Sequence, residues 1–131
     1  MEKKSRESFS ILIANYNNGH FFKDCYQSLI AQTYQDFEVV ILDDCSTDNS
    51  VEVITSMIGD DKRFKLHQND ENKKIGYTKR KLIELASSDI CGFLDPDDAL
   101  VPSAIEKVVE AYQENPNAGM VYSNFVISDK D

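Results

Sequence analysis

Short apolar runs alternate along this chain with segments of helical periodicity. Runs with the length and composition of strands span 10–14, 37–42 and 90–94, with a fifth strand predicted at 119–127. A more polar run at 64–68 predicts an edge strand. Because continuously apolar strands are buried on both faces, the pattern predicts an α/β fold: a mostly parallel, Rossmann-like sheet covered by helices on both sides.

Between these runs, apolar residues recur at the spacing of an amphipathic helix. Four helices are predicted, with apolar positions within 22–30, 51–58, 78–86 and 101–112. We expect Gly59 to end the second helix and Pro102 to lie in the first turn of the fourth. Right-handed crossovers then place every turn that leads from a strand to a helix at one edge of the sheet.

Length, charge and cysteine content limit the class of protein. The 131 residues fit a single domain over 1–131, and the net charge of −9 argues against a nucleic-acid binder. The same charge means that an anionic ligand needs a local cation. No apolar stretch is long enough to cross a membrane, and residues 1–6 lack the apolar core of a signal peptide. Three cysteines without C-x-x-C spacing predict reduced thiols in a cytoplasmic protein.

An acidic cluster, Asp95-Pro96-Asp97-Asp98, directly follows the predicted strand at 90–94. Open α/β sheets place their ligands at such strand ends. Three carboxylates this close repel one another, and a hard cation such as Mg²⁺ or Mn²⁺ removes that repulsion. The alternative is a solvated acidic turn in which Asp98 caps the following helix.

A second acidic pair, Asp43-Asp44, follows the second predicted strand. Ser46 or Asp48 could cap the next helix, so a second aspartate beyond the strand end exceeds what capping requires. Such a carboxylate can accept a hydrogen bond from a nucleobase N–H or a ribose hydroxyl. Tyr16, on the neighbouring turn, offers either a ring on which a base stacks or a residue packed beneath the sheet edge.

A basic cluster surrounds Gly76 near the start of the third predicted helix. Its members are Lys73, Lys74, Lys79, Arg80 and Lys81. A helix N-terminus flanked by cations suits a phosphate. Lys79 or Arg80 is the candidate for reaching a diphosphate, and the other three are interpreted as a solvated helix face. The chain has neither the P-loop nor the dinucleotide-binding glycine motif.

Five sequence motifs in this order resemble the family 2 glycosyltransferases, from about Phe9 to Val126. They are SILIANYN at 10–17, SLIAQTY at 28–34, FEVVILDD at 37–44, STDNS at 46–50 and FLDPDD at 93–98. Members of that family are inverting enzymes of the GT-A fold. The resemblance therefore implies a nucleotide-diphosphate-sugar donor, with a UDP-sugar favoured, a divalent Mn²⁺ or Mg²⁺ ion, and a saccharide or lipid-linked acceptor.

The resemblance also implies roles for single residues. Tyr16 and Asp44 would contact the nucleobase, and Asp95 would face the ribose. Asp97 and Asp98 would bind the metal, and either of them could be the inner-sphere ligand. The family often has Ala-Arg-Asn where this chain reads Thr78-Lys79-Arg80-Lys81, so the phosphate contact also stays open. The catalytic base is expected beyond Asp131, in an acceptor-binding half, and the chain alone is expected to bind donor without transferring sugar.

Three other classes were weighed against this interpretation. A phosphoacceptor receiver domain carries its acidic pair after the first strand, whereas Asp43-Asp44 follows the second. A haloacid-dehalogenase-type phosphatase has its D-x-D motif near the N-terminus, whereas Asp95 lies deep in the chain. The remaining alternative is a non-catalytic module that binds a nucleotide sugar.

Overall fold

The computed structural model of the chain describes residues 5–114 and 121–123. Its elements are β1 (Ser5–Asn15), the 3₁₀ helix η1 (Gly19–Phe21), α1 (Phe22–Ile30), β2 (Phe37–Asp43), α2 (Ser50–Ile58), β3 (Phe64–Gln68), α3 (Lys74–Leu85), β4 (Ser88–Phe93), α4 (Ala104–Glu114) and β5 (Val121–Ser123). The predicted alternation of strands and helices is confirmed. The rest of the strand predicted at 119–127 lies outside the described residues. Among the described helices, none combines the length and the apolar character that crossing a bilayer requires.

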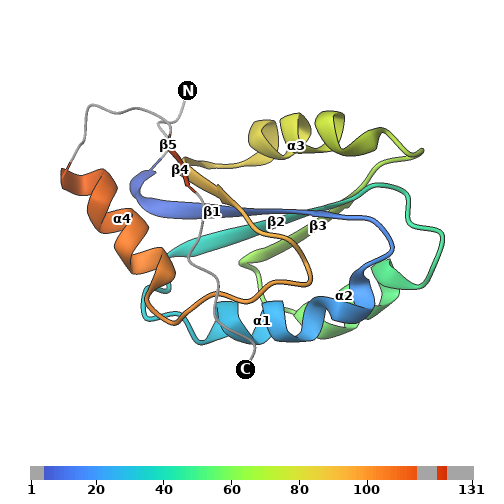
Figure 1. The fold of residues 1–131 in the computed structure, drawn as a ribbon, viewed down its shortest axis with the longest axis horizontal. Coiled ribbons are helices and arrows are strands. Elements are labelled where there is room, and N and C mark those ends of the chain that lie inside the picture. Colours follow the sequence, from blue (N-terminus) through green and yellow to red (C-terminus); the bar gives the residue numbers. More distant parts are fainter. Residues whose placement is uncertain (1–4, 115–120, 124–131) are drawn as a thin grey trace.

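All five strands are parallel and stand in the order β3-β2-β1-β4-β5. The predicted parallel sheet and the edge position of β3 are therefore confirmed. The chain builds outward from β1 to β3, then crosses to the other side of β1 to form β4 and β5. Where the strand order reverses in this way, the carboxyl ends of the two central strands leave a crevice for a ligand. These ends, of β1 and β4, lie toward the right of Figure 1.

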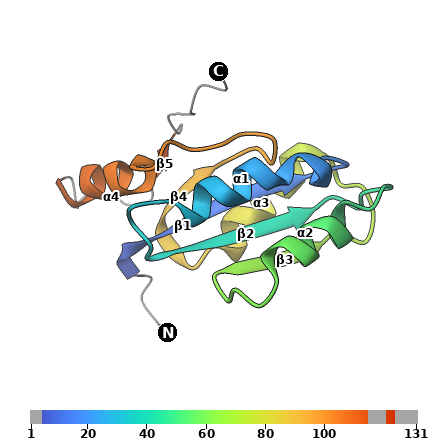
Figure 2. The same ribbon diagram turned by 90° about the horizontal axis from the view of Figure 1, so that it is seen from below.

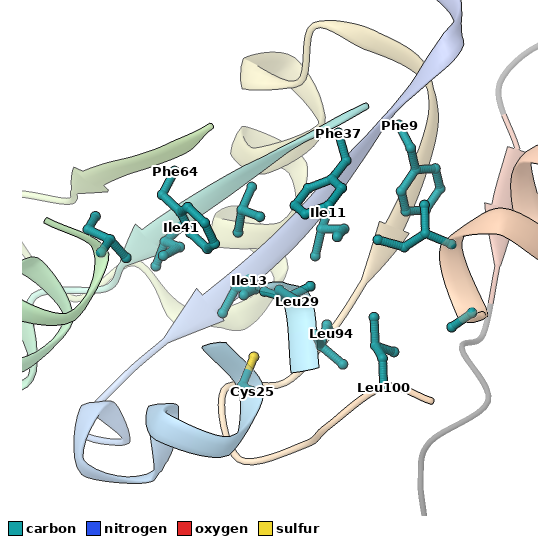
Figure 3. Close-up of a cluster of buried hydrophobic side chains, with 14 of the residues drawn as sticks. Phe9, Ile11, Ile13, Cys25, Leu29, Phe37, Ile41, Phe64, Leu94 and Leu100 are labelled. Atoms are coloured by element: carbon teal, nitrogen blue, oxygen red, sulfur yellow. The ribbon is translucent and has the colours of Figure 1, made fainter. Parts of the chain in front are cut away.

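Helices cover both faces of the sheet, with α3 on one face and α1, α2 and α4 on the other (Figures 1 and 2). Side chains of β1 alternate between the two cores, since Ile11 and Ile13 pack on the α1 side and Leu12 packs on the α3 side. The larger core, drawn in Figure 3, includes Leu94 and Leu100, which flank the acidic cluster. Both ends of the acidic loop are thus buried in the core.

One helix begins later than predicted. Helix α4 begins at Ala104, so Pro102 lies in the turn before it and not in its first turn. The same start excludes Asp98 as the cap of α4. Helix α3 begins at Lys74, close to Gly76, near which its start was predicted. The prediction that Gly59 ends α2 is confirmed, and its φ of 54° is one that glycine adopts without strain.

At the amino ends of the strands, the buried carboxylate of Glu38 joins three parts of the fold. It accepts hydrogen bonds from Ser10 Oγ (2.6 Å), Lys65 Nζ (2.7 Å) and the main-chain N–H of Ser87 (2.6 Å). Burial acts to raise the pKa of Glu38, but the hydrogen bonds from Lys65, Ser10 and Ser87 outweigh it and hold the pKa below its ordinary value.

We expect the Glu38→Gln variant to be less stable than the wild type at pH 7, by about 1–3 kcal/mol, because three donors lose a charged acceptor. Since the folded-state pKa is lowered, this stabilisation is complete above the ordinary glutamate value of 4.5 and is lost as the pH falls through the folded-state pKa. Urea unfolding between pH 3 and 7 measures it, with Glu110→Gln, an exposed site on α4, as the control. Wild type and Glu38→Gln curves that stay parallel across this range would contradict the prediction.

Candidate functional site

A cleft of about 510 Å³ opens at the carboxyl ends of β1 and β4. It is lined by Ala14, Asn15, Tyr16, Asn18, Asp44, Asn72, Lys74, Ile75, Thr78, Asp95, Pro96 and Asp97. These residues come from the end of β1 and the turn after it, from the turns after β2, β3 and β4, and from the first turns of α3. The structure therefore brings together the two acidic clusters, Tyr16 and one end of the basic cluster, as the sequence predicted for a single edge of the sheet.

The carboxylates of Asp95, Asp97 and Asp98 each offer one oxygen, and these oxygens lie within 4.8 Å of one another. The main-chain N–H of Asp98 donates to the carbonyl of Asp95 (3.0 Å), which closes the turn that gathers them. Asp95 and Asp97 are exposed and line the cleft, whereas Asp98 is half-buried and is not among the lining residues. A donor set made only of carboxylate oxygens fits a hard divalent cation such as Mg²⁺ or Mn²⁺.

The thiol of Cys25 lies near this acidic cluster on α1. Burial, and then the negative charges of Asp98, Asp97 and Asp95, raise its pKa well above the ordinary thiol range. Cys25 therefore stays a neutral core residue and does not add a thiolate to the oxygen ligands.

The segment that follows the acidic loop is held by Gln32, which is 3% exposed. Its side chain donates to the carbonyl of Val101 (2.8 Å) and accepts from the main-chain N–H of Ile105 (3.1 Å). The neighbouring Thr33 N–H donates to the carbonyl of Pro102 (2.9 Å). These bonds explain the late start of α4, because they fix 101–105 against the end of α1. The sequence analysis missed this residue, and its place in the motif at 28–34 was the available signal.

Asp44 has a structural role that the sequence analysis missed. Its buried carboxylate accepts hydrogen bonds from the main-chain N–H groups of Lys73 (2.7 Å) and Lys74 (3.0 Å), and from Asn69 Nδ2 (3.0 Å). Asp44 thus ties the turn after β2 to the first residues of α3 and anchors the start of that helix. Because Asp44 also lines the cleft, the predicted contact with a nucleobase stays open as a proposal.

The adjacent Asp43 is 1% exposed and closes its own turn. It accepts from Asn15 Nδ2 (2.8 Å), Ser46 N (2.8 Å) and Ser46 Oγ (2.6 Å), while Cys45 takes a φ of 60°. Ser46 therefore serves this turn. The N-cap of α2 is Asn49, so neither Ser46 nor Asp48 occupies that position; Asp48, one residue earlier, accepts from the main-chain N–H of Ser50 (2.9 Å).

Asn17 and Gly19 join the turn after β1 to the start of α2. The Asn17 side-chain oxygen accepts from the main-chain N–H groups of Thr47 (2.8 Å) and Asp48 (3.2 Å). The main chain of Gly19 packs so closely that a Cβ there would lie 2.6 Å from the Cα of Ser50. The two turns are thus bound to each other, and together they form one wall of the cleft.

Tyr16 stands on that wall and is 43% exposed, so its ring is not packed beneath the edge of the sheet. Ile75, which is 59% exposed, lines the same cleft from the start of α3. Two large apolar surfaces exposed inside one cleft suit a flat ring, such as a nucleobase.

The basic cluster divides between the cleft and its surroundings. Lys74 lines the cleft, whereas Lys79 and Arg80 are not among the lining residues. The Lys79 ammonium lies 5.2 Å from the centroid of the Phe93 ring, and Lys73 is paired with Glu71 (3.0 Å). The contact predicted for Lys79 or Arg80 stays a prediction, but Lys74, interpreted from sequence as part of a solvated face, is the cation that reaches the cleft.

Comparisons with known proteins agree with this arrangement. Residues 10–131 match the model of the family described as glycosyl transferase family 2. An uncharacterised glycosyltransferase of Nostoc sp. is 32% identical over 124 residues, which cover 93% of this chain and 38% of that protein. A glucosyl-dolichyl phosphate glucuronosyltransferase of Haloferax volcanii is 32% identical over 111 residues, covering 83% of this chain and 35% of that protein. The chain thus spans well under half the length of these two relatives.

Solved structures share the fold. The crystal structure of residues 1–349 of S. aureus TarS in complex with UDP has a TM-score of 0.74 and 24% identity, covering 82% of this chain and 32% of that chain. A mannosyltransferase from Pyrobaculum calidifontis, in complex with GDP-Man and Mn²⁺, has a TM-score of 0.69 and 17% identity, covering 80% of this chain and 31% of that chain. The predicted GT-A fold is confirmed, and with a family match that spans most of the sequence, the chain belongs to glycosyl transferase family 2.

Proposed function

We propose that this chain holds the donor of an inverting, metal-dependent glycosyltransferase, and that the donor is a nucleoside diphosphate sugar, with a UDP-sugar favoured. Tyr16 and Asp44 contact the nucleobase, and Asp95 contacts the ribose. Asp97 and Asp98 hold a divalent cation at the diphosphate. The complexes of similarly folded proteins with UDP, with UDP-GlcNAc, and with GDP-Man and Mn²⁺ support this class of ligand.

The observation that carries the proposal is the division of the cleft into two chemically different parts. The exposed Tyr16 ring and the buried Asp44 carboxylate stand on one side, after β1 and β2. Asp95 and Asp97 stand on the other, after β4. A nucleoside diphosphate has the same division, since a flat base with N–H donors is joined through ribose to an anionic diphosphate.

The chemistry that these residues support is displacement at the anomeric carbon. A bound Mg²⁺ or Mn²⁺ would supply positive charge that offsets the charge developing on the leaving diphosphate. The residues of this chain would orient the donor, with its base held beside Tyr16 and its diphosphate beside the acidic loop. In the whole enzyme an acceptor hydroxyl would attack that carbon from the opposite side while the bond to the diphosphate oxygen breaks, the nucleoside diphosphate leaves and a base takes the hydroxyl proton. A single displacement of this kind inverts the configuration.

Membership of a transferase family favours an enzyme over the non-catalytic binding module. In the whole protein, the acceptor of the sugar is a saccharide or a lipid-linked molecule.

We expect the chain to bind UDP in the presence of Mn²⁺ at least about tenfold more tightly than after chelation, because the acidic side of the cleft repels the diphosphate. Isothermal titration calorimetry with UDP, in MnCl₂ and in EDTA, measures this difference, and uridine serves as the control without phosphates. Equal UDP affinity in both solutions would remove the metal from the proposal. No UDP binding in either solution, by a folded chain, would remove the donor site.

A further inference from the structure

We propose that Lys74 is the residue through which this chain contacts the phosphates of the donor, an inference that rests on the proposed function. Among the residues that line the cleft, Lys74 carries the positive charge, whereas Asp44, Asp95 and Asp97 carry negative charges. An anionic diphosphate that enters this cleft is repelled by the carboxylates and attracted by the Lys74 ammonium. Neither Lys79 nor Arg80, the predicted phosphate contacts, reaches the lining.

The backbone at Lys74 is held in an unusual conformation. Its φ of 72° lies in the left-handed region, which costs a residue with a Cβ about 1–2 kcal/mol. The cost is offset by Asp44, whose carboxylate accepts hydrogen bonds from the main-chain N–H groups of Lys73 and Lys74. A glycine would adopt this φ without strain, so the conformation alone does not require a lysine. The lysine therefore adds a side chain at a position where the turn would favour glycine.

The same hydrogen bonds take up two main-chain donors at the start of α3. Helix N-termini commonly bind phosphates through free main-chain N–H groups. At the start of α3, the N–H groups of Lys73 and Lys74 are already donated to Asp44. The main chain at these two positions is thus occupied, and the Lys74 ammonium remains available to an anion at this end of the cleft.

Three of the four neighbouring cations are engaged elsewhere. Lys73 is paired with Glu71 (3.0 Å), Lys81 lies 3.9 Å from Glu84, and Lys79 lies over the Phe93 ring. Within the part of the chain that the structure describes, Lys74 forms no salt bridge, and it is exposed. Its ammonium can therefore approach an anion without first breaking an ion pair.

The test compares UDP with uridine in MnCl₂, by calorimetry, for the wild type and three variants. For Lys74→Gln we expect UDP affinity to fall about tenfold with uridine affinity unchanged, because a charge-assisted phosphate contact is lost. For Lys74→Gly we expect the same loss of UDP affinity together with an unchanged or raised melting temperature, since glycine relieves the backbone strain. Lys73→Gln, which removes a neighbouring positive charge outside the cleft, is expected to keep UDP affinity within about twofold.

Three outcomes would overturn the assignment. Wild-type UDP affinity in Lys74→Gln would show that its ammonium does not meet the phosphates. An equal loss of UDP and uridine affinity would show that Lys74 shapes the nucleoside part of the cleft instead. If Lys73→Gln lost as much UDP affinity as Lys74→Gln, the loss would come from the overall charge of the loop and not from a contact made by Lys74. The proposed function survives all three, because the wild type still binds UDP with metal, and it fails only when the wild type binds no UDP.

Discussion

Replacing Asp97 by asparagine should lower the affinity for UDP in MnCl₂ by about 100-fold, which corresponds to about 2.7 kcal/mol. Asp97 is exposed, lines the cleft and lies in the three-carboxylate cluster, so its charge is the one that a cation at the diphosphate would meet. Asparagine keeps the size of the side chain and a carbonyl oxygen but removes the negative charge that draws a hard cation. The loss should therefore appear as a loss of metal dependence, with uridine affinity and melting temperature little changed.

Calorimetry of the same variant in EDTA provides the decisive comparison. We expect Asp97→Asn to bind UDP equally in MnCl₂ and EDTA, whereas the wild type distinguishes them. Asp98→Asn should show a smaller loss, because Asp98 is half-buried and is not among the residues that line the cleft. Asp70→Asn, an exposed aspartate on the turn after β3, is the matched control for net charge. A wild-type metal response in Asp97→Asn would reduce the acidic loop to a solvated turn.

Replacing Asp44 by alanine should lower both the stability of the fold and the affinity for the nucleoside. Its carboxylate accepts three hydrogen bonds, two of them from main-chain N–H groups at the start of α3. Removing a buried charged acceptor of this kind costs about 3 kcal/mol, and a chain of this length then melts roughly 10 °C lower. Without Asp44, the main-chain N–H of Lys74 loses an acceptor that supports its positive φ, so the position of Lys74 should change as well.

Thermal unfolding and binding of uridine and UDP to Asp44→Ala measure these effects separately, at a temperature where the variant stays folded. We expect uridine affinity to fall and the remaining UDP affinity to stay metal-dependent, because the acidic loop is untouched. Asp44→Asn, which keeps one carbonyl acceptor, should recover part of the stability. An unchanged melting temperature would contradict the anchoring role, and unchanged uridine affinity would contradict the contact with the base.

Local sequence patterns were sufficient to predict the arrangement of the sheet and the place of the site. Strand residues such as Ile11 and Val39 belong to continuously apolar runs because both faces of the sheet are covered. Once the strands are parallel and the crossovers right-handed, the turns carrying Tyr16, Asp44 and Asp95 must meet at one edge. This convergence follows from chain topology, and side-chain detail is not needed to derive it.

Local patterns could not predict the exact first residues of α3 and α4. Nor could they predict which cation lines the cleft. The start of α3 depends on Asp44 holding the main chain of Lys73 and Lys74, about thirty residues away, and α4 depends on Gln32 holding Ile105 across 73 positions. Helical periodicity reports neither contact. A shift in the first turn of α3 changes which lysine faces the cleft, and the φ of 72° at Lys74 arises from that distant carboxylate. The sequence therefore specified which chemical groups meet at the edge of the sheet, while long-range hydrogen bonds determined which basic side chain enters the cleft.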